Sequence, residues 1–173
     1  SDLFHEDLTV EDIVKVFAVM ACAPRHEFQV LTKRASRMQG IVSAPQFRAM
    51  VEEFADALCE TDPKLGYIID PPDESGRMRW PLPNVWLGAS VEDQPRADER
   101  IPHLLATPAA VRMLSLEPLL GPVTLRKTVT PVGLAEIGWV IVGGESGHGS
   151  REMQVDWARS LRDECVAARV PFF

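Results

Sequence analysis

The sequence VWLGA, residues Val85–Ala89, is a short apolar run that is followed, from Asp93 onward, by apolar residues at helical spacing. Two further runs, Val111–Leu116 (VRMLSL) and Trp139–Val142 (WVIV), are bounded in the same way by polar or glycine-rich turns. Continuous apolar strands that alternate with helices are typical of a parallel sheet that is buried on both faces. The sequence therefore predicts an α/β fold, either a partial (βα) barrel or an open parallel sheet flanked by helices.

The same unit extends toward both ends of the chain. Thr9 and Asp12 have the spacing of a capping box and predict the start of an amphipathic helix, and Glu27–Leu31 (EFQVL) predicts a strand after it. Near the other end, Asp156 is expected to cap the last helix, and Val170–Phe173 (VPFF) is expected to begin a further strand. The recurring order of strand, polar tip and helix indicates that the strands are parallel.

Length and composition indicate a single α/β domain over residues 1–173. The chain has 173 residues, of which 46% are apolar and 25% are charged, close to the average of a globular protein. Roughly five strands are too few for a closed parallel barrel, which takes about eight, so the domain is expected to be an incomplete piece of a larger barrel. Residues 61–83 are rich in Pro, Asp and Gly and predict a long surface excursion.

Charge and hydropathy narrow the range of partners. The chain has 18 basic and 25 acidic residues, and its net charge of −7 gives no support to a general nucleic-acid surface. No apolar run approaches the ~20 residues that cross a bilayer, so we expect no membrane contact and a cytoplasmic location. Because an incomplete barrel has open sheet edges, we expect self-association or a partner chain that covers the strand ending at Phe173 or the edge near Ser1.

The three cysteines have none of the spacings of a metal knuckle or of a cluster-binding run. Cys22, Cys59 and Cys165 lie far apart in the sequence, in three different expected helices. We therefore expect buried free thiols and no metal site, since an unpaired cysteine behaves as a small apolar residue.

Polar residues stand directly after each expected strand. The candidate catalytic residues are Glu92, Glu117 and Glu145, and the candidate ligand-binding residues are Lys33, Arg34, Ser90, Ser115, Gly143, Gly144 and Ser146. Because parallel strands end at one rim, where the sites of α/β proteins form, we expect these residues to converge. Each of them, taken singly, also has a structural interpretation, since strand-to-helix turns are exposed and must cap a helix.

The chemistry of the expected rim is left open by the sequence. A carboxylate near a cation serves as a general base, as an acceptor for a hydroxyl or an amine, or as a metal ligand. Glu117 is the first choice among the carboxylates, because the apolar run before it delivers it to the rim and the segment after it does not resemble the start of a helix. The turn from Gly143 to Gly149 lacks the pattern of a phosphate-binding loop, and its backbone N–H groups are equally compatible with ligand contact and with a simple tight turn.

Five motifs occur in order along the whole chain. They are Ser1–Glu6 (SDLFHE), Gln29–Arg34 (QVLTKR), Pro83–Gln94 (PNVWLGASVEDQ), Glu117–Gly121 (EPLLG) and Trp139–Gly147 (WVIVGGESG). Together they resemble the phage gene-product 37/68 family, a group of uncharacterised function found in phages and bacterial genomes. Residues 61–80 depart from the shorter connection that is usual in that family.

The resemblance implies a phage-type protein that is similar to the body of a radical-SAM-like enzyme. Full-length members of the family carry an N-terminal segment of three closely spaced cysteines, which in radical-SAM enzymes hold a [4Fe–4S] cluster that cleaves S-adenosylmethionine. This sequence contains no such segment, so we expect a truncated domain without a cofactor of its own, and S-adenosylmethionine and [4Fe–4S] only in the full-length family. The alternative is a non-catalytic binding module that acts on a host factor.

Overall fold

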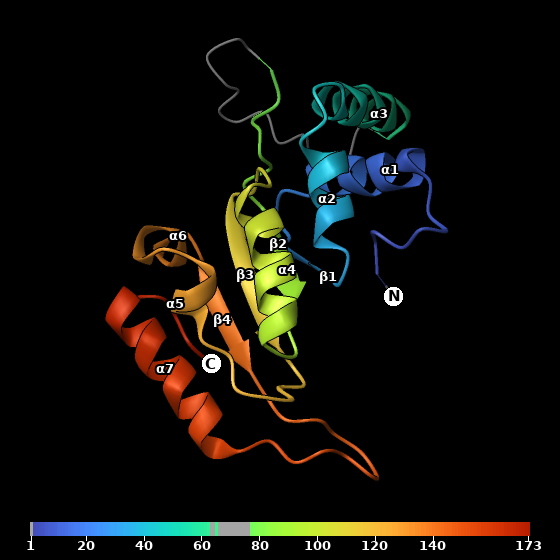
Figure 1. The fold of residues 1–173 in the computed structure, drawn as a ribbon. Coiled ribbons are helices and arrows are strands. Elements are labelled where there is room, and N and C mark those ends of the chain that lie inside the picture. The colour runs from blue at the N-terminus through green and yellow to red at the C-terminus, as the bar shows by residue number, and fades with distance from the viewer. Residues whose placement is uncertain (1, 63–64, 66–76) are drawn as a thin grey trace.

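The computed structural model describes residues 2–62, 65 and 77–173 and forms an α/β fold (Figure 1). Most of the excursion expected over residues 61–83 lies outside the described residues. The elements are α1 (Val10–Ala21), β1 (Phe28–Thr32), α2 (Ala35–Val42), α3 (Phe47–Thr61), β2 (Val85–Ser90), α4 (Gln94–Leu105), β3 (Val111–Leu116), α5 (Leu125–Thr128), α6 (Pro131–Ala135), β4 (Trp139–Val142) and α7 (Val155–Ala168).

The four strands form one parallel sheet in the order β1-β2-β3-β4. This confirms the predicted open parallel sheet flanked by helices. The expected strand near the C-terminus is also present in part, because Phe172 forms a parallel bridge with Val140 and the backbone N–H of Phe173 donates to the Val140 carbonyl at 2.9 Å. The C-terminus therefore lies beside β4 (Figure 1).

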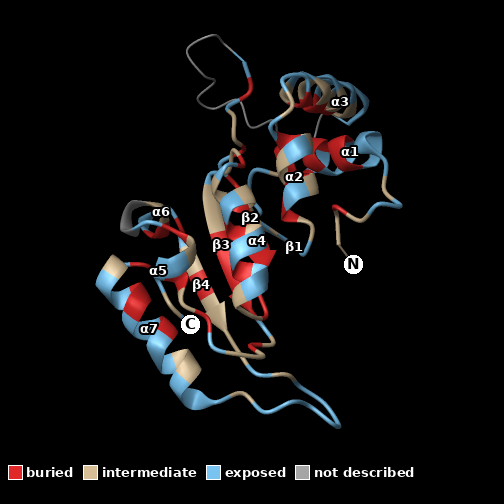
Figure 2. Cartoon of the chain, viewed as in Figure 1, coloured by how far each residue is buried: buried red, intermediate tan, exposed pale blue. Residues whose placement is uncertain are grey.

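Helices cover one face of the sheet. The strand order has no reversal, and connections of one hand between successive parallel strands place their helices on the same side. Alternate strand residues point to that side and form the core: Leu87 and Ala89 of β2, and Leu114 and Leu116 of β3, are at most 2% exposed (Figure 2). This one-sided arrangement is compatible with a (βα) barrel segment and differs from a doubly wound sheet, whose strand order reverses.

The opposite face carries large side chains that do not belong to the core under the helices. The rings of Trp86 and Trp139 reach toward each other, with centroids 6.2 Å apart and planes at 87°. Met113 of β3 lies against Gly88 of β2, where a Cβ atom would stand 2.6 Å from the Met113 Cγ. Glycine at position 88 therefore allows the Met113 side chain to lie flat across the sheet. Within the described residues, the expectation that helices bury both faces is thus met on one face only.

Local signals at the helix ends are confirmed in two cases and wrong in one. The Thr9 and Asp12 side chains form the expected capping box of α1, and Asp93 caps α4 by accepting from the Arg96 N–H at 2.9 Å. Asp156 is not the cap of α7, because Gln154 occupies the cap position, the helix begins at Val155, and Asp156 lies in its first turn. A carboxylate in the first turn still interacts favourably with the positive end of the helix dipole. An aspartate near the start of a helix is therefore expected both at the cap position and in the first turn, and the sequence does not distinguish the two. No helix in the described part of the chain has the length and apolar character of a membrane span.

Candidate functional site

A pocket of about 380 Å³ lies at the carboxyl ends of the strands. It is lined by Lys33, Glu92, Asp93, Arg96, Arg100, Pro118, Leu120, Glu145 and Arg151. Three of the side chains predicted from the sequence, Lys33, Glu92 and Glu145, are thus brought together from segments that follow three different strands. The three arginines were not predicted. Arg96 and Arg100 stand four residues apart on the helix that follows β2, and this spacing is the signal that could have placed them on the rim.

Glu92 is held between two cations. The Lys33 Nζ lies 2.5 Å from one of its carboxylate oxygens, and the Arg100 Nη1 lies 2.9 Å from the other. Arg100 also donates to the Ser90 carbonyl at 2.8 Å, so it ties the end of β2 to α4. Burial tends to raise the pKa of Glu92, but the Lys33 hydrogen bond and the charges of Arg100 and Lys33 outweigh it and lower the pKa below its usual value. Glu92 is therefore an ionised structural anchor rather than a proton acceptor at neutral pH.

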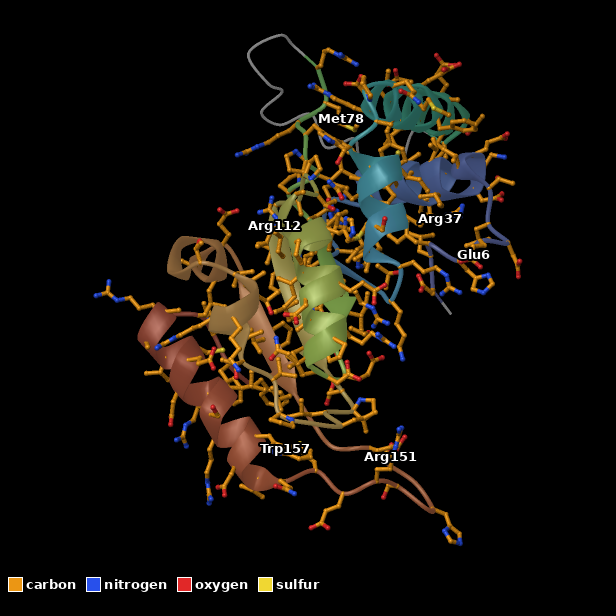
Figure 3. The ribbon with its side chains drawn as sticks, viewed as in Figure 1. Glu6, Arg37, Met78, Arg112, Arg151 and Trp157 are labelled. Carbon is orange, nitrogen blue, oxygen red and sulfur yellow. The ribbon has the colours of Figure 1, made fainter. Side chains whose placement is uncertain are left out.

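Glu145 is neutralised by a different arginine. Arg151 lies on the turn between β4 and α7 (Figure 3), and its Nε and Nη2 donate to the two Glu145 oxygens at 2.8 and 2.6 Å. The Arg151 backbone N–H adds a third bond at 2.9 Å. The side-chain and backbone hydrogen bonds from Arg151 lower the pKa of Glu145 to about 2. This carboxylate therefore links the glycine-rich turn to Arg151, six residues later in the chain.

Glu117 differs from both of these carboxylates. It is exposed, and within the described residues its carboxylate has no hydrogen bond and no ion pair. Its side chain lies over Gly143, where an added Cβ would overlap the Glu117 carboxylate. The Leu119 N–H donates to the Gly143 carbonyl at 2.9 Å and holds the two segments together. Glu117 is thus a positioned carboxylate whose oxygens can accept a hydrogen bond from a ligand.

Two serines, Ser90 at the end of β2 and Ser115 near the end of β3, lie on the face of the sheet opposite the helices, close to Glu117. Ser90 and Ser115 are paired in register on β2 and β3, and each is 6% exposed. Neither hydroxyl forms a hydrogen bond with another residue in the part of the chain that the structure describes. Since side chains two residues apart in a strand point to the same face, Ser115 and Glu117 share the face that carries Trp86 and Met113. This face therefore carries the aromatic side chains of Trp86 and Trp139 along the strands and polar side chains at the carboxyl ends of the strands.

Arg34 does not line the pocket. Its guanidinium binds Asp2 at 3.0 Å and Glu6 at 3.4 Å, and Asp2 also accepts from the Thr32 hydroxyl at 2.7 Å. Burial raises the pKa of Asp2, but the hydrogen bonds from Thr32, Phe4 and Arg34 outweigh it, and the pKa is lowered. Arg34 therefore fastens the N-terminal segment to the carboxyl end of β1.

The glycine-rich turn contributes Glu145 to the pocket, whereas Gly143 does not line it and lies against the Glu117 side chain. Gly144 and Ser146, which were also predicted as ligand-binding residues, are exposed and are not among the residues that line the pocket. Both stand next to Glu145, whose side chain folds back onto Arg151. The turn thus places its one carboxylate, Glu145, in the pocket.

The described residues do not fit an iron–sulfur cluster. Among residues 2–62, 65 and 77–173, no group of three or more His, Cys, Asp or Glu side chains is arranged to hold a metal ion. Cys22 and Cys59 lie together, with their Sγ atoms 3.6 Å apart, and Cys165 belongs to α7. We therefore assign no step to a cluster held by these side chains.

The fold and the site define an α/β protein with a four-stranded parallel open sheet and a charged pocket at the carboxyl ends of its strands. The chain belongs to the family described as protein of unknown function (DUF5131), whose family model matches residues 1–173. A comparison with curated proteins gives no significant match. A comparison with solved structures gives none either.

Proposed function

We propose that this chain is the body of a phage-type, radical-SAM-like enzyme and that the polar end of its uncovered sheet face binds S-adenosylmethionine or the substrate. The observation that carries the proposal is the set of Ser90, Ser115 and Glu117, whose polar side-chain atoms share one face and have no partner in the described part of the chain. Ser90 and Ser115 are buried residues and Glu117 is exposed, so this set at the carboxyl end of the sheet offers two hydroxyls and a carboxylate to which a ligand can hydrogen-bond.

The chemistry of this end of the sheet suits a ligand with both signs of charge. S-adenosylmethionine has an ammonium, a carboxylate, ribose hydroxyls and an aromatic base, and its sulfonium makes the attached carbons reactive. Glu117 accepts hydrogen bonds from an ammonium, and the two serine hydroxyls both donate to and accept from a sugar. Lys33 and Arg96, which line the neighbouring pocket, supply positive charge for a carboxylate.

The direct test is calorimetric titration of the protein with S-adenosylmethionine. Glu117→Gln is expected to weaken binding at least tenfold, which corresponds to about 1.4 kcal/mol, while the free energy of unfolding changes by less than about 1 kcal/mol because the side chain is exposed. Glu27→Gln is the matched control, since Glu27 is an exposed glutamate at the amino end of β1. A folded wild-type protein that binds no S-adenosylmethionine, or an equal loss in both variants, contradicts the proposal.

The second candidate function is that of a binding module, and a groove along the edge of the sheet favours it. The groove has a volume of about 430 Å³ and lies between Val16, Val19 and Met20 of α1 and Phe28 and Val30 of β1. β1 is an edge strand in the described sheet, and an open edge pairs readily with an added strand. An apolar groove beside such an edge fits an extended apolar segment.

For this candidate we propose a second copy of the chain as the occupant. The opposite edge of the same sheet ends in the apolar segment Val170–Phe173, and Phe173 is 77% exposed. One edge of the parallel sheet therefore offers an apolar groove, and the other edge offers an apolar segment that can fill it. Contact between the β1 edge of one copy and the C-terminal segment of another would extend the sheet without reversing its direction.

Sedimentation at tens of micromolar protein tests this association. The wild-type chain is expected to sediment as a dimer or larger species, and Val19→Lys is expected to shift it to the monomer. Val155→Lys on α7 is the control, because Val155 has a similar exposure, 57% against 54% for Val19. A wild-type chain that sediments as a clean monomer contradicts the second candidate.

A further inference from the structure

Cys22 and Cys59 form a close pair of thiols that lines neither the pocket nor the groove described above. Cys22 ends α1, and Cys59 lies near the end of α3. Their Sγ atoms are 3.6 Å apart, although the residues are 37 positions apart in the sequence. A disulfide needs about 2.05 Å between the sulfurs, so a combined movement of about 1.5 Å brings them to bonding distance.

The two thiols differ in accessibility. Cys22 is buried, at 4% exposure, whereas Cys59 is half-buried. Burial, together with the hydrogen bond and charge of Cys59, raises the pKa of Cys22 to about 12. The Cys22 Sγ also lies 3.6 Å from the Ala55 carbonyl, to which it donates. Cys59 is therefore the thiol that a small oxidant reaches first, and Cys22 is held beside it as the second thiol.

We propose that Cys22 and Cys59 are a dithiol that hydrogen peroxide oxidises to a disulfide. The Cys59 sulfur attacks one peroxide oxygen, the O–O bond breaks, and a sulfenic acid and one water form. The Cys22 sulfur then bonds to the Cys59 sulfur and displaces the hydroxyl, which leaves as a second water with the Cys22 proton. Both sulfurs are oxidised by one electron each, and the peroxide is reduced by two.

The disulfide has a structural consequence for the N-terminal half of the chain. It joins α1 to α3, which pack against each other through contacts that include Phe17 and Phe47, whose ring centroids are 5.2 Å apart. A cross-link between distant positions lowers the entropy of the unfolded chain, so the oxidised form is expected to unfold at a higher temperature. Because α1 also forms one wall of the apolar groove, the cross-link is expected to restrict the movement of that wall relative to α3.

Cys165 supplies the matched control within the same chain. It is fully buried on α7, and burial raises its pKa to about 11. Within the described residues no other thiol lies against it. A reaction that depends on a neighbouring thiol therefore occurs at the Cys22–Cys59 pair and leaves Cys165 reduced.

The test is treatment of the folded full chain with a small excess of hydrogen peroxide, followed by intact mass and non-reducing peptide mapping. The wild-type protein and Cys165→Ser are expected to lose about 2 Da, to lose two thiols each, and to show a higher unfolding temperature that a dithiol reductant reverses. In Cys22→Ser the mass loss is expected to disappear, and a sulfenic acid at Cys59 is expected to be trapped by dimedone. The proposal is overturned if wild-type Cys22 and Cys59 stay reduced, if Cys165 is oxidised first, or if Cys59 gains oxygens without forming the disulfide.

Discussion

Glu92→Gln removes the negative charge that lies between Lys33 and Arg100. The substitution keeps the size and shape of the side chain, so its effect on stability comes from the lost charge. In the wild-type protein, the Glu92 carboxylate oxygens lie 2.5 Å from the Lys33 Nζ and 2.9 Å from the Arg100 Nη1. Without this carboxylate the Arg100 guanidinium, whose side chain is 12% exposed, is left as a nearly buried cation.

The two ion pairs of Glu92 contribute unequally to the free energy of unfolding. The Lys33 side chain is 57% exposed, and an exposed pair contributes only about 0–1 kcal/mol. The contact with Arg100 is shielded from water on both sides, and a hydrogen bond to a charged group in such a place contributes about 1.5–3 kcal/mol. Gln retains an oxygen that accepts from Arg100, so we expect Glu92→Gln to lower the free energy of unfolding by about 2 kcal/mol at pH 7.

The same reasoning predicts how this loss depends on pH. The pKa of Glu92 is lower in the folded protein than its usual value of about 4.3, because the Lys33 and Arg100 interactions outweigh burial. The contribution of the carboxylate is therefore complete above the unfolded pKa and is lost as the pH falls through the folded pKa. Gln does not titrate, so the difference between wild type and variant is expected to be smaller at pH 3 than at pH 7.

Urea denaturation followed by circular dichroism at both pH values measures the difference. Glu99→Gln is the control, because Glu99 is 60% exposed and its contact with Arg96 is 3.7 Å long, so its loss is expected to change stability by less than about 0.5 kcal/mol. A cost for Glu92→Gln no larger than that of the control, or the same cost at pH 3 and pH 7, refutes the assignment of Glu92 as an ionised anchor.

Three further predictions concern the core, a helix cap and the second ion pair. Leu114→Ala, in the middle of β3 and fully buried, is expected to destabilise the protein by about 2–5 kcal/mol in the same urea assay, and a cost below 1 kcal/mol would contradict the described core. Asp93→Ala removes the cap of α4 and is expected to cost about 1 kcal/mol, whereas Asp93→Asn, which retains a capping oxygen, is expected to cost less. Arg151→Met is expected to raise the pKa of Glu145 from about 2 toward the ordinary value, measured by carbon NMR of the carboxyl group; an unchanged midpoint shows that other groups hold it low.

The helices and strands that the sequence predicted are those with a local signal. Val111–Leu116 and Trp139–Val142 are strands with the expected bounds, and Thr9 and Asp93 cap helices through side chains that are close in sequence. The connection between Glu117 and Gly138 contains α5 and α6, for which the sequence contains no such signal. Helices of four and five residues are too short to show a helical period, so hydrophobic spacing does not reveal them.

The sequence also placed polar residues at the ends of the strands, but it did not indicate how their charges pair. Lys33, Glu92 and Glu145 reach one pocket because parallel strands end at one rim. The partners of these groups come from other elements: Arg100 from α4 and Arg151 from the turn before α7. Long side chains have many rotamers, and only the packed chain decides which charges meet.

The order of residues by itself determined that the chain forms parallel strands alternating with helices, because backbone geometry and apolar periodicity act over a few neighbouring residues. Only the tertiary structure decided that the helices lie on one face, that Glu92 and Glu145 are neutralised by arginines, and that Glu117 has no partner in the described part of the chain. These outcomes depend on strand order and on contacts between distant segments. Three glutamates with similar positions after their strands therefore differ in charge environment: arginines neutralise Glu92 and Glu145, and Glu117 has no ion pair within the described residues.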